Sequence, residues 1–255
     1  MNQIEKNLSA FKVISLEELD PIKLMKRYDT KFIFQKDKLT SVFDYLYKDY
    51  QILEIDKKRS FTYENLYYDT DDYFFYYQHH NQRLNRYKIR CRRYIDSNQC
   101  YFEIKFKNNK KKTIKTRLLL EDIFINSELS ENSKEFARKG VFKYNLDIID
   151  IIKPKLWIDF NRITFANPSN KERLTVDINL TYTDKISRTK KINNLIIAEL
   201  KSENLSFNST FYRYLKNLKI FPANFSKYCM GIAITEKNIK RNRFKKDLSK
   251  LKILS

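Results

Sequence analysis

The chain has 255 residues, of which 51 are Lys or Arg and 31 are Asp or Glu, so its formal net charge is +20. Hydrophobic residues form 42% and aromatic residues 15% of the sequence, which predicts one packed domain and excludes a disordered chain. Only two glycines are present, which excludes a Gly-rich phosphate loop. Any bound phosphate must therefore be held by side chains.

Metal and redox chemistry are also limited by composition. The two histidines, His79 and His80, are adjacent, and the three cysteines lack metal-ligand spacing, so neither a zinc site nor a serine-protease triad is expected. A metal would have to sit on carboxylates, which favours Mg²⁺ or Mn²⁺. The odd cysteine count favours the cytoplasm, and no stretch approaches the roughly 20 apolar residues of a membrane helix.

Strand-like alternation recurs along the chain and predicts eight strands, at 27–35, 61–69, 86–95, 100–108, 113–120, 155–166, 171–179 and 194–201. Helical spacing appears at 36–50, 130–144 and 208–218 and in the segment that Ser226 opens. The short polar loops 96–99 and 109–112 predict that the third to fifth strands form an antiparallel meander. The expected class is α+β, an eight-stranded antiparallel β-barrel with helices packed outside.

The chain shows no repeat and no linker, which predicts a single domain over 21–236. It is flanked by an amino-terminal leader, 1–20, and a basic tail, 237–255. Eight of the nineteen tail residues are Lys or Arg. The tail could bind a polyanion, a membrane-protein partner or the inner face of a membrane, although a solvated helix is the simpler interpretation.

The same alternation places the charged residues of each strand on one face. In the third strand Lys88, Arg90 and Arg92 share one face, because successive side chains of a strand point to opposite sides. The same pattern recurs in the other strands, at Arg27, Asp29, Lys31, Glu103, Lys105, Lys107, Lys115, Arg117, Arg162, Arg173, Asp177, Glu199 and Lys201. A polar face turned to water would explain it, but such a face usually mixes signs to limit cross-strand repulsion. Turned inward, it would form a positive channel that attracts phosphate chains.

Three carboxylates, Glu103, Asp177 and Glu199, share the face of these cations. Each could be the counter-charge of a neighbouring Arg or Lys, or could hold a divalent cation that bridges substrate oxygens. For Glu199, within the segment IIAELK, the metal role is favoured.

Nine short strings together resemble the VTC (vacuolar transporter chaperone) polyphosphate polymerase domain, a branch of the CYTH-like triphosphate tunnel metalloenzymes. They are RYDTKF (27–32), NLYYDT (65–70), KIRCRRY (88–94), YFEIKFK (101–107), KTR (115–117), DFNR (159–162), RLTVD (173–177), AELK (198–201) and FSKY (225–228). The resemblance covers most of the chain and implies a stand-alone catalytic domain.

The resemblance implies a tunnel in which the γ-phosphate of ATP passes to a growing polyphosphate chain with the help of Mn²⁺ or Mg²⁺. The expected catalytic residues are Lys31, Arg90, Arg92, Lys105, Arg162 and Arg173. Substrate binding is expected from Lys88, Lys115, Arg117, Lys201, Ser226 and Lys227, and metal binding from Glu199 and Glu103. Phosphoryl transfer requires mainly positioning and charge neutralisation, which such a set supplies.

Two other functions remain open at this stage. A metal-dependent triphosphatase of the same fold differs only in accepting water, but the first strand carries Arg27, Asp29 and Lys31 where triphosphatases carry alternating glutamates. A non-catalytic polyanion or RNA binder would suit the charge and the 18 tyrosines. The tyrosines fall mostly in apolar stretches such as YFFYYQ (73–78), where core packing is the simpler interpretation, and DNA is not an expected partner.

Overall fold

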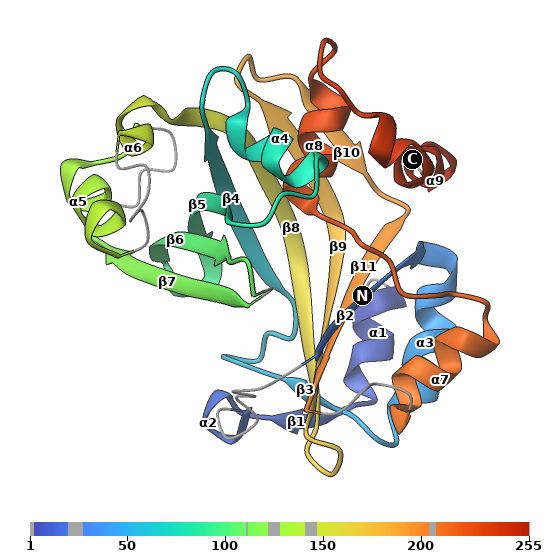
Figure 1. Cartoon of the computed structure of the whole chain (residues 1–255). Helices are drawn as coiled ribbons and strands as arrows, with labels where there is room; N and C mark the ends of the chain where they lie inside the picture. The colour runs from blue at the N-terminus through green and yellow to red at the C-terminus, as the bar shows by residue number, and fades with distance from the viewer. Residues whose placement is uncertain are drawn as a thin grey trace.

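The computed structural model describes residues 3–19, 28–110, 112–121, 128–140, 147–203 and 208–254. Its centre is a large, mainly antiparallel sheet with helices on both sides, an α+β architecture (Figure 1). The main path of the sheet runs in the order β2 (Tyr28–Gln35), β11 (Leu195–Ser202), β9 (Glu172–Asp184), β8 (Lys153–Asn167), β4 (Phe61–Asp69), β5 (Arg86–Tyr94), β6 (Gln99–Lys107) and β7 (Thr113–Leu120).

These are the eight strands that alternation predicts, and the meander of β5, β6 and β7 is confirmed by their antiparallel pairing. Alternation missed three shorter strands, β1 (Lys12–Ile14), β3 (Gln51–Leu53) and β10 (Thr189–Ile192). Three or four residues are too few for a period of two to stand out. β1 pairs with β3 in parallel, β3 extends onto β8, and β10 pairs with β9.

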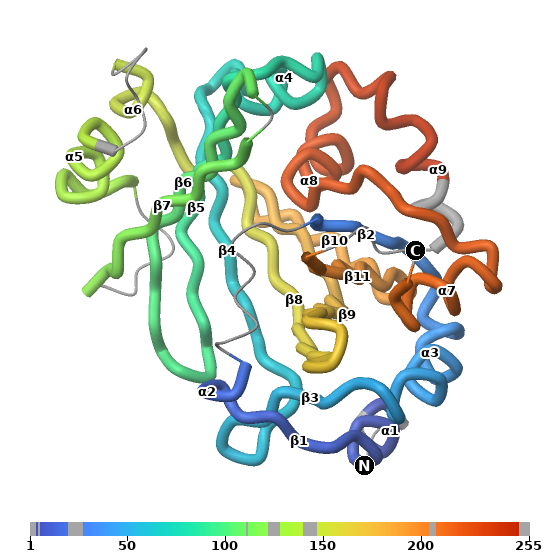
Figure 2. The backbone as a smooth tube through the Cα atoms, turned by 60° about the horizontal axis from the view of Figure 1, so that its bottom comes forward, coloured from blue at the N-terminus to red at the C-terminus, as the bar shows by residue number. Residues whose placement is uncertain are grey.

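The sheet curls without closing by strand pairing. Its path ends at β2 and β7, and within the described ranges no ladder joins these two strands, so the expected closed barrel is not seen. In Figure 2 the meander stands on one side and β2 and β11 on the other, with β4 and β8 between them. The segment before α8 (Lys227–Thr235) spans the two sides. Ala223 N donates to Lys31 O at 2.8 Å, and Lys88 Nζ donates to Ser226 Oγ at 3.0 Å.

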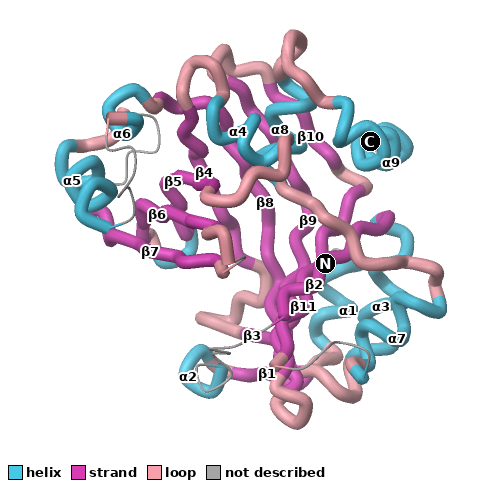
Figure 3. The backbone as a smooth tube through the Cα atoms, viewed as in Figure 1, coloured by secondary structure: helices cyan, strands magenta, loops and turns pink. Residues whose placement is uncertain are grey.

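Helices cover the outer face of the sheet, as expected (Figure 3). On one half, α1 (Gln3–Ser9), α3 (Leu39–Leu46) and α7 (Thr210–Asn217) pack against apolar residues of β2, β11, β9 and β8. On the other half, α5 (Glu131–Gly140) and α6 (Ile148–Ile151) cover β4, β5 and β6. The helix expected at 130–144 is thus α5, and residues 141–146 lie outside the described ranges.

The inner face is not polar throughout, which corrects the expectation from alternation. Its upper part is apolar and is covered by α8 and by α4 (Phe74–His80), the helix that contains most of YFFYYQ. Gly231 of α8 lies so close to the sheet that an added Cβ would clash with the side chains of Leu156 and Tyr182. A β-bulge between Asp159 and Asn161 of β8 lies where the apolar part of the face meets the charged part.

Both terminal segments pack on the domain. Leu8 of α1 and Phe11, from the stretch expected as a leader, are buried in the core together with residues of α3. Within the tail, a 3₁₀ turn (Asn242–Phe244) and α9 (Lys245–Leu254) follow, and Phe244 and Leu248 pack against the α8 cluster. The remaining short helices are α2 (Leu16–Leu19) and the 3₁₀ turns Lys36–Lys38 and Ile95–Ser97.

All three cysteines lie in the described ranges as buried free thiols. In the described part of the chain, every helix is too short or too polar to span a bilayer.

Candidate functional site

The lower part of the inner face carries rows of charged side chains that run across the strands. One row joins Lys88, Lys105 and Lys115, which are direct partners on β5, β6 and β7. The next row joins Arg90, Glu103 and Arg117 on the same strands. Lys115 and Arg117 are exposed, because β7 forms the open edge of the sheet, and Lys105 of β6 is exposed as well.

The opposite side of the inner face is built by β2, β11, β9 and β8. Glu199 of β11 lies between Lys31 of β2 and Thr175 of β9. One step along, Lys201 lies between Asp29 and Arg173.

The two sides approach one another closely enough to interact electrostatically. Burial raises the pKa of Glu199, but the fields of Lys201, Lys31, Arg162 and Lys105 outweigh it and lower the pKa to about 2. Because Lys105 belongs to β6, the meander faces β11 across the inner face. Glu199 therefore remains ionised at neutral pH in a strongly positive surrounding.

Glu103 is held by two of the cations that surround it. Its side chain is 1% exposed, accepts from Arg90 Nε at 2.7 Å and forms an ion pair with Lys115. Burial raises the pKa of Glu103, but Arg90, Arg92 and Lys115 lower it far below its usual range. Both partners are positioned by this carboxylate, which the sequence offered as a metal ligand or as a counter-charge.

Asp177 plays the same part on β9. Arg162 of β8, its direct cross-strand partner, donates to it through Nε at 2.6 Å and Nη2 at 2.8 Å. Lys227, the first residue of α8, forms a second ion pair with the same carboxylate. The fork of Arg162 is therefore fixed in the plane of the carboxylate.

Glu199 differs from the other two carboxylates. Among the described residues it has neither a hydrogen bond nor an ion pair within contact distance, although cations surround it. No group of three or more His, Cys, Asp or Glu side chains in the described part of the chain could enclose a metal ion. A hard cation at Glu199 would thus need phosphate oxygens or water to complete its ligands, which suits Mg²⁺ or Mn²⁺.

Aromatic rings, which the sequence reading assigned to the core, support several of the guanidinium groups. Tyr63 lies between Arg92 and Arg162, whose Cζ atoms are 5.2 and 5.0 Å from its ring centroid. Arg117 lies 4.8 Å above the ring of Tyr101. Alternation within 61–69 could have revealed this, since Tyr63, Asn65 and Tyr67 share a face. Asn65 Oδ1 accepts from Arg92 Nε at 2.8 Å.

The amino-terminal end of α8 completes the site. Ser226 is the N-cap, and its Oγ accepts from Cys229 N at 3.2 Å and from Lys88 Nζ at 3.0 Å. Ser226 and Lys227 are thereby brought to the cations of β5 and β9, far from them in sequence. Arg27 lies outside the described residues; all fourteen residues expected at the site are described, on the inner face or at this helix end.

Comparison with solved structures shows the fold class. A Hippeastrum protein described as an adenylyl cyclase with a dominant triphosphatase activity aligns with a TM-score of 0.53 at 11% identity, covering 84% of this chain and 98% of its own. A Bacillus halodurans protein described as a candidate adenylate cyclase aligns with a TM-score of 0.49 at 14% identity, covering 84% of this chain and 100% of its own. The chain therefore shares its overall fold with the Hippeastrum protein.

The sequence itself identifies the family. Residues 26–236 match the family model described as the VTC domain, so the chain belongs to the VTC domain family. A search of curated proteins found no significant match.

Proposed function

We propose that the protein is a polyphosphate polymerase that transfers the γ-phosphate of ATP to a growing inorganic polyphosphate chain with the help of Mn²⁺ or Mg²⁺. The observation that carries this proposal is the crowding of cations from opposite sides of the sheet around Glu199, a carboxylate without an ion-pair partner among the described residues, in a member of the VTC domain family. A triphosphate and a polyphosphate chain are both linear polyanions, and one positive surface can bind them in line.

The side chains have distinct parts in this proposal. Arg90 and Arg162, held by Glu103 and Asp177, present rigid donors to phosphate oxygens, and Lys31, Lys105 and Lys201 supply point charges. Because Glu103 and Asp177 position these arginines before substrate arrives, little reorganisation is needed as charge develops on the transferred group. The acceptor is an ionised phosphate, so the transfer needs no general base to activate it.

A divalent cation bound beside Glu199 would neutralise charge on the phosphate oxygens and align donor and acceptor. Glu199 would contribute its carboxylate to it, and substrate oxygens would supply other ligands. Ordinary cytoplasmic concentrations of ATP and Mg²⁺ suit such a site, and the free thiols agree with a reducing compartment.

A triphosphatase is the second candidate, because the Hippeastrum protein of similar fold is described as having that activity. Because the two proteins are 11% identical, their similarity supports a shared fold and not a shared activity. β2 presents Asp29 and Lys31 where a hydrolytic two-metal site would need paired carboxylates, which favours the transferase.

The test is incubation of purified protein with ATP and Mn²⁺ or Mg²⁺, with the products separated on a gel stained for polyphosphate and with ADP and free phosphate measured in parallel. A ladder of long chains with stoichiometric ADP is the expected result. Free phosphate without chains would replace the proposal with a triphosphatase. Tight tripolyphosphate binding without turnover would leave a polyanion-binding module.

A further inference from the structure

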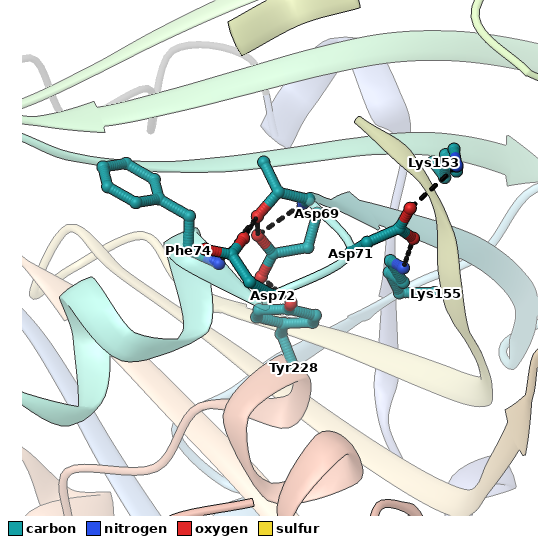
Figure 4. Close-up of polar contacts among 8 residues, drawn as sticks. Asp69, Asp71, Asp72, Phe74, Lys153, Lys155 and Tyr228 are labelled. Carbon is teal, nitrogen blue, oxygen red and sulfur yellow. Dashed lines mark hydrogen bonds and ion pairs between the residues drawn. The ribbon is translucent and has the colours of Figure 1, made fainter. Parts of the chain in front are cut away.

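A buried tyrosine and a buried aspartate join the two helices that cover the inner face. The Tyr228 hydroxyl donates to Asp69 Oδ2, and both side chains are almost fully buried (Figure 4). Asp69 is the last residue of β4, and Tyr228 lies in the first turn of α8. Burial and the facing carboxylate raise the pKa of Tyr228 far above its usual value, so the phenol keeps its proton.

Asp69 is itself immobilised by the start of α4. Its Oδ1 accepts from the backbone N–H groups of Thr70 and Phe75, both at 2.8 Å, and its Oδ2 accepts from that of Tyr76 at 2.9 Å. Three backbone donors and a phenol therefore satisfy one buried carboxylate. Neighbouring Asp71 binds Lys153 at 2.8 Å and fixes the same turn to β8 (Figure 4). The anchor for Tyr228 is rigid.

From Tyr228, two connections lead into the candidate site. The first is the chain itself, because Ser226 and Lys227 directly precede Tyr228 and contact Lys88 and Asp177. The second is a stack of rings: Tyr228 lies on Tyr67 with centroids 5.1 Å apart and an interplanar angle of 19°. The hydroxyl of Tyr67 accepts from Arg90 Nη1 at 2.8 Å.

The helix end lies among charges that both attract and repel it. Burial lowers the pKa of Lys227, and the nearby Arg162 and Lys31 lower it further against the pull of Asp177. Lys88 and Lys31 likewise repel each other beside Ser226. The Lys227–Asp177 ion pair and the Lys88–Ser226 hydrogen bond hold the first turn of α8 from below, and the Asp69–Tyr228 bond holds it from the other side.

We propose that the Asp69–Tyr228 pair is a positioning device that holds the first turn of α8 and, through Tyr67, Arg90 in the geometry that binds phosphate. The proposal rests on the phosphate-binding function proposed above and assigns to it two residues that do not touch the substrate. Removing the Tyr228 hydroxyl leaves the stacked ring in place but frees the helix end, so affinity for phosphate chains falls.

The chain offers a matched control. Tyr50 donates to Glu172 through the same buried phenol–carboxylate bond, but on the outer face beneath α3 and α7. Tyr50→Phe and Tyr228→Phe therefore each remove one buried hydrogen bond to a carboxylate, with similar expected losses of stability. Only Tyr228 is connected to the inner face.

The experiment measures the Kd of inorganic tripolyphosphate by calorimetry without metal for the wild-type protein and both variants. In parallel, backbone hydrogen exchange is measured at Cys229 and Met230, whose N–H groups are bound to Ser226 at 3.2 and 2.9 Å. We expect Tyr228→Phe to weaken binding about tenfold and to speed exchange at these amides. Tyr50→Phe should change neither.

Equal effects of the two variants on Kd and on exchange would overturn the positioning role, since stability alone would then explain them. Unchanged exchange in Tyr228→Phe would overturn it as well. If the wild-type protein binds no tripolyphosphate, the proposed function fails, and the exchange comparison still decides whether Tyr228 holds the helix end.

Discussion

Glu199 of β11 and Lys31 of β2 lie directly opposite one another in the antiparallel pair. The field of Lys31, with those of Lys201, Arg162 and Lys105, outweighs the effect of burial and keeps the carboxylate ionised. An ionised group without a contact partner among the described residues can accept an incoming cation without breaking an existing ion pair. Glu103 and Asp177, each engaged by two cations, would have to give up a partner first.

The first prediction is that Glu199→Gln abolishes metal-dependent turnover while tripolyphosphate binding without metal is kept or strengthened. Loss of a negative charge among cations favours an anion, whereas an amide is a much weaker ligand for Mg²⁺. Turnover is followed by ADP release, and binding by calorimetry. Glu203→Gln is the control, since Glu203 is exposed and pairs with Lys171. Full activity of Glu199→Gln would remove Glu199 from the metal site.

The second prediction concerns pH. Burial lowers the pKa of Lys201 to about 8, and Arg162 adds to this against the pull of Glu199. A bound phosphate favours the charged amine, so binding takes up a proton above pH 8 and affinity falls as the pH rises. Well below pH 8 the lysine is already charged, and its contribution is constant. The Kd of tripolyphosphate measured from pH 7 to 9.5 should depend on pH more steeply in the wild type than in Lys201→Met; equal slopes would contradict the assignment.

The third prediction is that Glu103→Gln lowers the free energy of unfolding by about 3 kcal/mol, because Arg90 and Lys115 lose their shared partner. Tripolyphosphate should then stabilise the variant more than it stabilises the wild type, since the phosphate replaces the missing charge. Urea unfolding with and without tripolyphosphate measures both effects. If Glu103 instead holds the metal, the variant will lose metal-dependent activity, and tripolyphosphate will not stabilise it more than it stabilises the wild type.

The fourth prediction uses the contact between α8 and the sheet. Gly231→Ala places a methyl group against Leu156 and Tyr182, so α8 must shift, at a cost of about 1–3 kcal/mol. We expect a lower thermal midpoint and weaker tripolyphosphate binding, because Ser226 and Lys227 move with the helix. An unchanged thermal midpoint would show that α8 can shift without loss of stability.

The fifth prediction concerns Asp159, which lies outside the candidate site. Burial and the facing Glu64 raise the pKa of Asp159 from 3.8 to about 6. The folded state therefore binds more protons than the unfolded state between these values, and stability falls as pH rises through this range. Asp159→Asn should raise the free energy of unfolding by about 2 kcal/mol at pH 7.5 and leave it unchanged below pH 4. An equal increase in the free energy of unfolding at both pH values would show that the effect comes from packing and not from the charge of Asp159.

The long strands could be read from the sequence because each carries apolar side chains on one face and charges on the other. Phe102 and Ile104 face α5 and α6, while Glu103 and Lys105 face inward, and this alternation survives whatever the neighbours are. The short strands β1 and β3 and the helix α4 depend instead on tertiary packing. Phe74–His80 is apolar on most sides because it lies between two clusters, and such a stretch has no helical period to detect.

The candidate site, too, was predictable only in part from the sequence. Alternation was enough to place Lys88, Arg90 and Arg92 on one face, because the direction of a strand side chain is set by the backbone. The sequence favoured Glu199 for the metal, but it could not show which carboxylate lacks an ion pair among the described residues, since Glu103 and Glu199 both alternate with cations. The difference arises from cross-strand neighbours: Glu103 lies beside Arg90, within reach of a forked ion pair, and Glu199 lies beside Lys31 and Thr175.

By itself the sequence determined the eight long strands, the face that carries the charges and the family, since all three depend on local order along the chain. Only the tertiary structure decided that the sheet curls without strand pairing between its ends, that α8 covers the upper inner face, and that Asp69 anchors Tyr228. The Asp69–Tyr228 bond alone joins residues 159 positions apart, and the geometry of such contacts follows from packing and burial, which no local pattern encodes.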